Sequence, residues 1–276
     1  MDHGGGAVNA ARRAGRFLFP LLLSTVLMFV LWQLFLLAFP QVGPRVGKSP
    51  GDIWRYLVTA PGAADARRVL TAELQITLRD AGIGFAVGMA VAVTLAALFV
   101  SFRAVEQTFL PVAMILRSVP LVALTPIIVL VFGRGLGGVT AMAAIVVLFP
   151  ALVLILAGLR AAPRQATDVV AAFGGSRWTA LRLVAIPAAL PAVFAAARIS
   201  VPGALIGALI GEWLGSGSGL GAGIIRAIPT FQYNKLWASI VLVTLVSVLL
   251  YALVGVLESL VLARFGPAAG MTQPGT

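Results

Sequence analysis

The chain has 276 residues, of which 60% are hydrophobic and 11% are charged, and its formal net charge is +11. Soluble domains average about half apolar and about a quarter charged residues, so the composition excludes an ordinary water-soluble fold and indicates a chain solvated by lipid. Cysteine is absent, which excludes disulfides and thiolate chemistry, and His3 is the single histidine, so a metal site or a histidine-based catalytic triad would need unusual ligands.

The first predicted elements are a polar tail and a membrane helix. Residues 17–39 form an uncharged apolar run, and about 20 such residues cross a bilayer. Residues 1–16 precede this run as a cytoplasmic tail, and the run is too long for the apolar region of a secretory signal. Residues 40–80 are polar and contain several prolines, which predicts an external loop. Within it, residues 65–80 predict a helix that lies at the membrane interface and continues into the next span.

Residues 81–262 predict a five-helix core, which brings the total to six transmembrane helices in an all-α integral membrane fold. The second span covers residues 81–102 and carries Gly84 and Gly88 one turn apart, a spacing that suits close packing against another helix. The remaining predicted spans are residues 109–132, 137–159, 190–213 and 237–262.

Two segments outside these spans complete the prediction. Residues 215–223 are rich in glycine and serine and predict a flexible or tightly turned external loop, and residues 263–276 form a C-terminal tail. Lysine and arginine are divided equally between the two sides, so the positive-inside rule does not fix the orientation. The arginine cluster beside the first helix favours a cytoplasmic N-terminus; its members are Arg12, Arg13 and Arg16.

The polar insert at residues 160–187 predicts two short helices joined by a tight turn. Pro163 suits the first turn of a helix, and Gly174 suits the left-handed position after its end. Ser176 can cap the second helix, and Pro187 is expected to stop it. An apolar ridge is expected on one side, formed by Val169, Ala172 and Phe173. Basic residues are expected to face solvent or lipid headgroups, and they are Arg164, Arg177 and Arg182.

The spacing in this insert resembles the EAA loop, E-A-A-x3-G-x9-I-x-L-P, of permease subunits of binding-protein-dependent ABC importers. The glycine and proline of the pattern are present, whereas Asp replaces Glu and Val-Val replaces Ala-Ala. The positions that fall on the pattern are Asp168, Val169, Val170, Gly174, Val184, Ile186 and Pro187.

Two other segments resemble the sulfonate, taurine and nitrate branch of this family. Residues 116–126 contain Leu-Arg-Ser-Val-Pro followed by Leu-Thr-Pro, similar to the third-span stretch of that branch. Residues 211–221 begin with Gly-Glu-Trp and end with Gly-Leu-Gly, similar to a later segment of the same branch. The resemblance extends over residues 70–262.

The resemblance implies a type I importer permease in a bacterial plasma membrane. Two copies, in the simplest case a homodimer, would form the translocation pathway, with ABC-type ATPase subunits on the cytoplasmic face and a solute-binding protein outside. ATP and Mg²⁺ would bind the ATPase, and this chain would hold no cofactor, metal or catalytic residue. A nucleic acid partner is not expected, since the arginines lie between apolar runs. The residues that would contact the ATPase are Asp168, Val169, Val170, Phe173, Gly174, Ser176, Arg177 and Pro187.

Three charges lie at predicted membrane depth, where charge is costly and often marks a transport pathway. They are Arg117, Arg198 and Glu212. One hypothesis is that an arginine faces the pathway and attracts an anionic solute such as a sulfonate, taurine or nitrate. The alternatives are an interhelical Arg–Glu pair or an arginine that extends to the interface.

Other functions remain as alternatives. Residues 47–49, Gly-Lys-Ser, match the end of a phosphate-binding loop, but Pro50 follows and no buried strand precedes them, which argues against an ATP site. An ion-coupled carrier would need internal repeats and matched intramembrane acids, and a membrane transferase would need clustered carboxylates or histidines. The sequence shows neither pattern, and translocation without catalysis in this chain is the preferred function.

Overall fold

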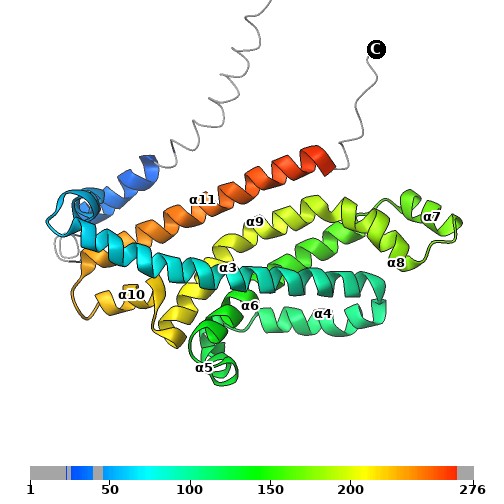
Figure 1. Ribbon diagram of the computed structural model, residues 1–276, viewed down its shortest axis with the longest axis horizontal. Helices are drawn as coiled ribbons and strands as arrows, with labels where there is room; N and C mark the ends of the chain where they lie inside the picture. Colours follow the sequence, from blue (N-terminus) through cyan, green and yellow to red (C-terminus); the bar gives the residue numbers. More distant parts are fainter. Residues whose placement is uncertain (1–22, 24–25, 40–45, 266–276) are drawn as a thin grey trace, which may run out of the picture.

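The computed structural model describes residues 23, 26–39 and 46–265, and the regular structure within those ranges is entirely helical (Figure 1). The predicted tail at residues 1–16, the start of the first predicted span and residues 266–276 lie outside the described residues. The part of the first span that is described forms a helix over Val26–Ala38. Its Trp32 ring stacks on Trp237, with 5.4 Å between centroids, which attaches this helix to the body.

Four helical stretches are long and apolar enough to cross a membrane. The first is α3, Ala63–Ser101, which at about 1.5 Å per residue is longer than the roughly 30 Å hydrocarbon layer. The second is α6, Leu136–Arg160. The third runs from Arg177 to Ser216 through α9, Ile186–Gly211, and the fourth is α11, Tyr233–Phe265. The remaining helices of the described chain are α2, Pro50–Trp54; α4, Arg103–Arg117; α5, Leu121–Phe132; α7, Arg164–Ala172; α8, Arg177–Ala180; and α10, Gly219–Ala227.

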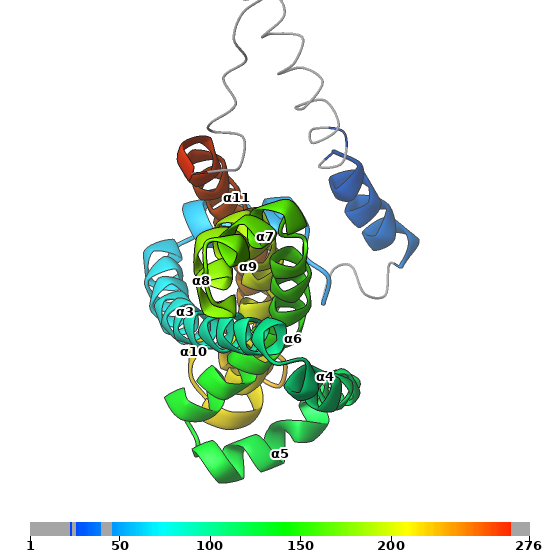
Figure 2. The ribbon, with the colours of Figure 1, turned by 90° about the vertical axis from the view of Figure 1, so that its right-hand side faces the viewer.

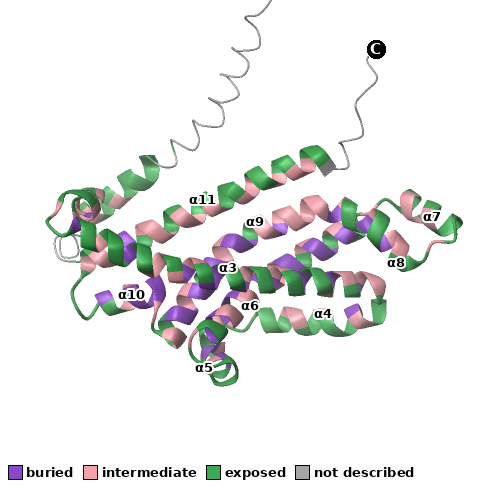
Figure 3. Cartoon of the chain, in the orientation of Figure 1, coloured by how far each residue is buried: buried purple, intermediate pink, exposed green. Residues whose placement is uncertain are grey.

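The core forms where α3, α6 and α9 pack together, and small residues allow their close approach (Figure 3). A Cβ added at Gly84 would lie 2.3 Å from the Cβ of Ala143, and one at Gly88 would lie 2.7 Å from the carbonyl oxygen of Ala144. On α9, a Cβ added at Gly207 would lie 2.6 Å from the Cα of Ala143. The predicted small-residue face of α3 is therefore confirmed, and α6 is its partner.

The predicted third span differs from the structure, which places two helices there. α4 and α5 meet at an angle of 108°, and the break lies at residues 118–120. Pro120 caps α5 and has no N–H to continue α4, and the residue before a proline is disfavoured in helical conformation. Counting the bent pair as one, the described residues hold up to five spans, and the predicted total of six is not confirmed.

The expectation that Pro187 stops the second short helix is wrong. The chain continues from α8 through a π-helical turn, Leu181–Ala185, directly into α9. The Ile186 N–H donates to the Leu181 carbonyl five residues back, so the wider turn absorbs the change in hydrogen-bond register just ahead of the proline. Pro187 then lies on the first turn of α9, directly after the π-helical turn.

The prediction of a glycine-rich loop at residues 215–223 is also wrong. A π-helical turn, Glu212–Ser216, and a left-handed Gly217 lead into α10, and Gly219 to Gly223 are buried. Glycine serves here for close packing: a Cβ at Gly221 would lie 2.3 Å from the carbonyl oxygen of Leu209, and one at Gly223 would lie 2.6 Å from the Glu73 carboxylate. Within the predicted external segment, residues 65–80 are helical and continue into the next span as expected, since both belong to α3.

Candidate functional site

The turn between α7 and α8 projects from one end of the bundle, opposite α10 (Figure 1). α7 begins after Pro163, and Gly174 follows it with φ +77°, a conformation that glycine adopts without strain. The Gly175 N–H donates to the Val170 carbonyl at 2.8 Å, and Ser176 Oγ accepts from the Thr179 N–H at 3.2 Å. Both helix ends are thus capped where the sequence indicated.

The surface of this turn is unusually apolar for an exposed segment. Phe173 is 89% exposed and Val169 is 55% exposed, in agreement with the predicted ridge. Sequence reasoning missed Trp178 and Leu183, which are 65% and 63% exposed and extend the ridge onto α8 and the π-helical turn that follows it. Their signal was present, since both are large apolar residues inside a polar insert. We call these four residues the apolar ridge.

Among the other predicted coupling residues, Asp168, Gly174, Ser176 and Arg177 are exposed in the same turn, and Val170 is half-buried. Pro187 does not belong to this turn, because it lies on the first turn of α9 beyond the π-helical segment. The structure therefore brings seven of the eight predicted coupling residues together on one capped projection.

Glu212 lies in a closed polar contact and has no exposed surface. Its Oε2 accepts from Thr77 Oγ1 at 3.0 Å and from the Gly221 N–H at 2.8 Å. Thr77 Oγ1 in turn accepts from the Leu220 N–H at 3.0 Å. Glu212 and Thr77 each accept one N–H from the first turn of α10, and the bond between them fastens α10 to α3. Thr77 was not identified from the sequence.

Arg198 lies between α9 and α11. Its Nη1 is 3.6 Å from Glu258 Oε2, and its guanidinium carbon is 4.4 Å from the centre of the Tyr251 ring. The interhelical Arg–Glu alternative thus has a structural counterpart, with Glu258 as partner rather than Glu212. Arg117 ends α4, is exposed, and has no ion pair within the described residues. The three predicted pathway charges are not brought together.

A second polar contact joins three helices at the α10 end. Glu73 of α3 lies 2.7 Å from Lys235 Nζ of α11 and 3.7 Å from Arg226 Nη2 of α10. Together with the Glu212 contact, it locks α10 between α3 and α11.

The Gly-Lys-Ser segment serves as a helix cap. Ser49 caps α2: its Oγ accepts from the Asp52 N–H at 3.2 Å, and its own N–H donates to the Asp52 carboxylate at 3.0 Å. The second of these bonds is the main reason that the pKa of Asp52 is lowered. Within the described part of the chain, His, Asp and Glu form no group of three placed to hold a metal ion.

The comparisons with known proteins decide the family. The family described as "Binding-protein-dependent transport system inner membrane component" matches residues 82–263. The chain belongs to this family. It is therefore a multi-pass membrane permease subunit of a binding-protein-dependent ABC transporter, and the matched residues contain the α7–α8 turn.

Curated relatives agree with this assignment. A probable ABC transporter permease protein of Haemophilus influenzae is 32% identical to this permease over 181 residues, which cover 63% of the chain and 68% of the relative. The riboflavin transport system permease protein RibX of Chloroflexus aurantiacus is 35% identical over 88 residues, or 32% of the chain and 33% of RibX.

Solved structures show the same fold. One match is a chain of the methionine ABC transporter MetNI in inward-facing conformations, with a TM-score of 0.57 and 21% identity. The match covers 74% of the permease and 99% of the MetNI chain. The permease also covers 96% of a chain from an amino acid ABC transporter, with 73% of its own length, a TM-score of 0.55 and 18% identity.

Proposed function

We propose that this permease forms the translocation pathway of an ATP-driven importer and is driven by a separate ATPase bound at the α7–α8 turn. The observation that carries the proposal is the apolar ridge on a capped, projecting turn. A phenylalanine left 89% exposed to water loses about 1.5–3 kcal/mol of burial free energy that a groove on a partner would recover.

The path from this turn into the membrane supports its role in coupling. α8 continues through the π-helical turn into α9, so the segment Arg177–Ser216 is one continuous helical stretch. A displacement of the turn reaches the core through a stiff helix rather than a flexible linker, as mechanical coupling between two states requires. The coupling residues proposed from the sequence keep this role, with Pro187 acting at the base of the helix.

The assembly proposed here contains more than this chain. A second permease copy, in the simplest case identical, would complete the pathway, and a solute-binding protein would deliver solute at the α10 end. The N-terminal tail at residues 1–16 would be cytoplasmic and residues 40–80 external, in a bacterial plasma membrane. ATP and Mg²⁺ would bind the ATPase, so this subunit is proposed to be non-catalytic and to need no cofactor of its own.

The solute proposed from the sequence is a small anion of the sulfonate, taurine or nitrate class, and the partial match to a riboflavin permease adds a vitamin-like solute. Arg117 is the stronger pathway candidate of the two arginines, since Arg198 is engaged by Glu258 and Tyr251. Glu212 is proposed to shape the pathway indirectly, through α10.

Replacing Arg117 with glutamine should weaken transport of an anion but leave that of a neutral solute unchanged.

Co-purification from membranes tests the ATPase contact. Phe173→Ala removes the most exposed side chain of the ridge, and the ATPase that is co-expressed with the permease should be lost or reduced on purification. Phe231→Ala is the matched control, because Phe231 is 77% exposed at the opposite end of the molecule. Gly174→Pro, which cannot keep φ +77°, should abolish ATP hydrolysis by the complex. Retention of the ATPase by Phe173→Ala at wild-type level would contradict the proposal.

A further inference from the structure

α4 and α5 are joined to the neighbouring helices by non-helical residues at both ends, and α5 also packs against α6. Phe102, in extended conformation, breaks the chain between α3 and α4, and Gly133 and Gly135 separate α5 from α6 with φ of +80° and +102°. A Cβ added at either glycine would meet no atom within 4 Å, so their side-chain positions are open. The two helices lie to one side of the α3–α6–α9 bundle (Figure 2).

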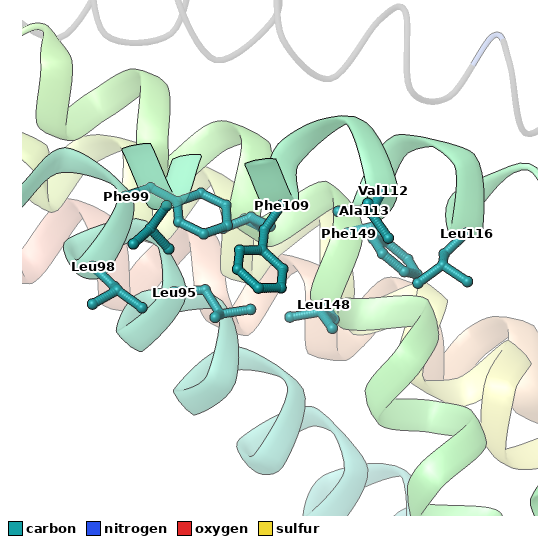
Figure 4. A pocket seen from close by; sticks show the side chains of 11 residues that line it. Leu95, Leu98, Phe99, Phe109, Val112, Ala113, Leu116, Leu148 and Phe149 are labelled. Carbon is teal, nitrogen blue, oxygen red and sulfur yellow. The ribbon is translucent and has the colours of Figure 1, made fainter. Parts of the chain in front are cut away.

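The interface between α4 and the bundle is loosely packed. A groove of about 300 Å³ lies between α3, α4 and α6, and Phe109 and Leu116 of α4 face Leu95 and Leu148 across it (Figure 4). The groove is open on one side, so α4 makes fewer dispersion contacts with the bundle there than a closed interface would provide. Apolar contacts of this kind are also non-directional and allow one surface to slide on the other.

One directional contact bridges this interface. Glu106, in the first turn of α4, is 7% exposed and forms an ion pair with Arg160. Within the described residues, it is the ion pair that joins α4 to another helix. Arg160 is the last residue of α6 and stands four residues before the start of α7, so the contact lies beside the coupling turn. A charge-assisted hydrogen bond fixes direction as well as distance, which the groove does not.

We infer that the Glu106–Arg160 pair makes α4 and α5 follow the coupling turn, and that Glu106 and Arg160 are positioning residues for transport. The inference rests on the proposed function, since it needs the turn to be moved by an ATPase. When the α7–α8 turn shifts, the end of α6 and its last residue, Arg160, shift with it. The ion pair then moves Glu106 in the same direction. Phe102 and the two glycines, which lie outside the helices, absorb the rotation, and the groove allows it.

Spin-label distances in the full transporter test this inference. The chain has no cysteine, so cysteines can be introduced at Ile115 of α4, which is 69% exposed, and at Gln165 of α7 without removing others. A reference pair joins Ile115 to Val91 of α3. Labelled chain diluted into excess unlabelled chain keeps one labelled copy per complex. Distances are measured without nucleotide and with ATP and Mg²⁺ under non-hydrolysing conditions.

In the wild type, ATP should change the 115–91 distance and leave the 115–165 distance unchanged, because α4 follows α7. Glu106→Gln should abolish this behaviour: the 115–165 distance should shift with ATP and its distribution should broaden. The exchange Glu106→Arg with Arg160→Glu should restore it. Asp65→Asn, which removes the exposed Asp65–Arg68 pair, is the matched control and should behave as the wild type.

The inference is overturned if α4 follows α7 equally well in Glu106→Gln, or if the exchange fails to restore the wild-type distances. Should Glu106→Gln not assemble, the half-exposed partner supplies the same test, with Arg160→Gln expected to lose the correlation and Arg160→Lys to keep it. ATPase content and ATP hydrolysis are measured on the same samples. Their absence from the wild type would refute the proposed function, whereas their presence without any dependence on Glu106 would refute this inference alone.

Discussion

Glycines at the start of α10 show how a single hydrogen atom in place of a side chain sets local structure. Gly217 and Gly219 both have left-handed backbones, with φ of +70° and +83°. Around Gly217 an added Cβ would meet no atom within 4 Å, whereas at Gly219 it would lie 2.3 Å from the Glu212 carboxyl group. The first position therefore requires glycine only for its backbone, and the second also requires it to admit Glu212.

Comparison of two alanine substitutions separates these requirements. Gly217→Ala should cost about 1–2 kcal/mol, the price of a left-handed non-glycine residue. Gly219→Ala should cost this and the displacement of Glu212 in addition, which leaves buried N–H groups unsatisfied at about 1–3 kcal/mol. Thermal unfolding in detergent should give a clearly lower Tm for Gly219→Ala. Equal Tm values would show that Glu212 does not hold α10 as described.

At the scale of elements, the permease is organised by how closely three helices approach. α3 and α9 both contact α6 near Ala143, through Gly84 on one side and Gly207 on the other. The hydrophobic effect does not favour helix association within lipid. Close backbone contact and the dispersion energy that it provides must stabilise the helix pairs. The most apolar stretch of α11 has no buried residues, so close backbone packing does not hold this helix. Its ion pairs to the other helices are made by Lys235 and Glu258.

A pair of substitutions on α3 tests this packing. Gly84→Ala forces its Cβ against Ala143 and should destabilise the protein by about 1–3 kcal/mol through overpacking. Gly82→Ala is the matched control on the same helix, with no atom within 4 Å, and should be neutral or stabilising by up to about 1 kcal/mol. Thermal stability in the same detergent measures both. A similar gain in stability for both variants would mean that helix propensity, rather than contact with α6, governs this position.

The whole molecule has two distinct ends. The α7–α8 turn with its apolar ridge stands at one, and α10, locked by Glu212 and Glu73, stands at the other (Figure 1). The proposed importer, driven from one side of the membrane and loaded from the other, would require such a division. α4 is fastened near the ridge end through Glu106, and α5 packs against α6.

Thiol labelling in intact cells tests the orientation of these ends. Single cysteines are introduced at Phe173 and Phe231, which are both exposed, into a chain with no other cysteine. A membrane-impermeant maleimide should label position 231 in intact cells whose outer barrier has been removed, and position 173 only after the membrane is permeabilised. The reverse pattern would place the ridge outside the cell and contradict coupling to a cytoplasmic ATPase.

The sequence predicted the features that depend on local chemistry. Long apolar runs gave α6, most of α3 and α11, and left-handed glycine with a capping serine gave the turn at Gly174 and Ser176. The interpretation failed where a distant contact overrides a local signal. Gly219 to Gly223 have the composition of a loop yet form a buried helix, because Thr77 and Glu212 supply partners for its N–H groups.

The sequence by itself determined that this protein lives in a membrane, where its apolar runs lie, and that residues 163–176 form a capped turn, since composition and residues a few positions apart suffice for each. Only the tertiary structure decided the 108° bend between α4 and α5, the continuity of α8 with α9, and the partners of Arg198 and Glu106. The two ion pairs join residues that are more than 50 positions apart in the sequence. The bend and the continuous helix each lie beside a proline, which can either break a helix or be accommodated in one, depending on the surrounding packing. Nothing in a local pattern records that choice, because it is made by the free energy of the assembled bundle.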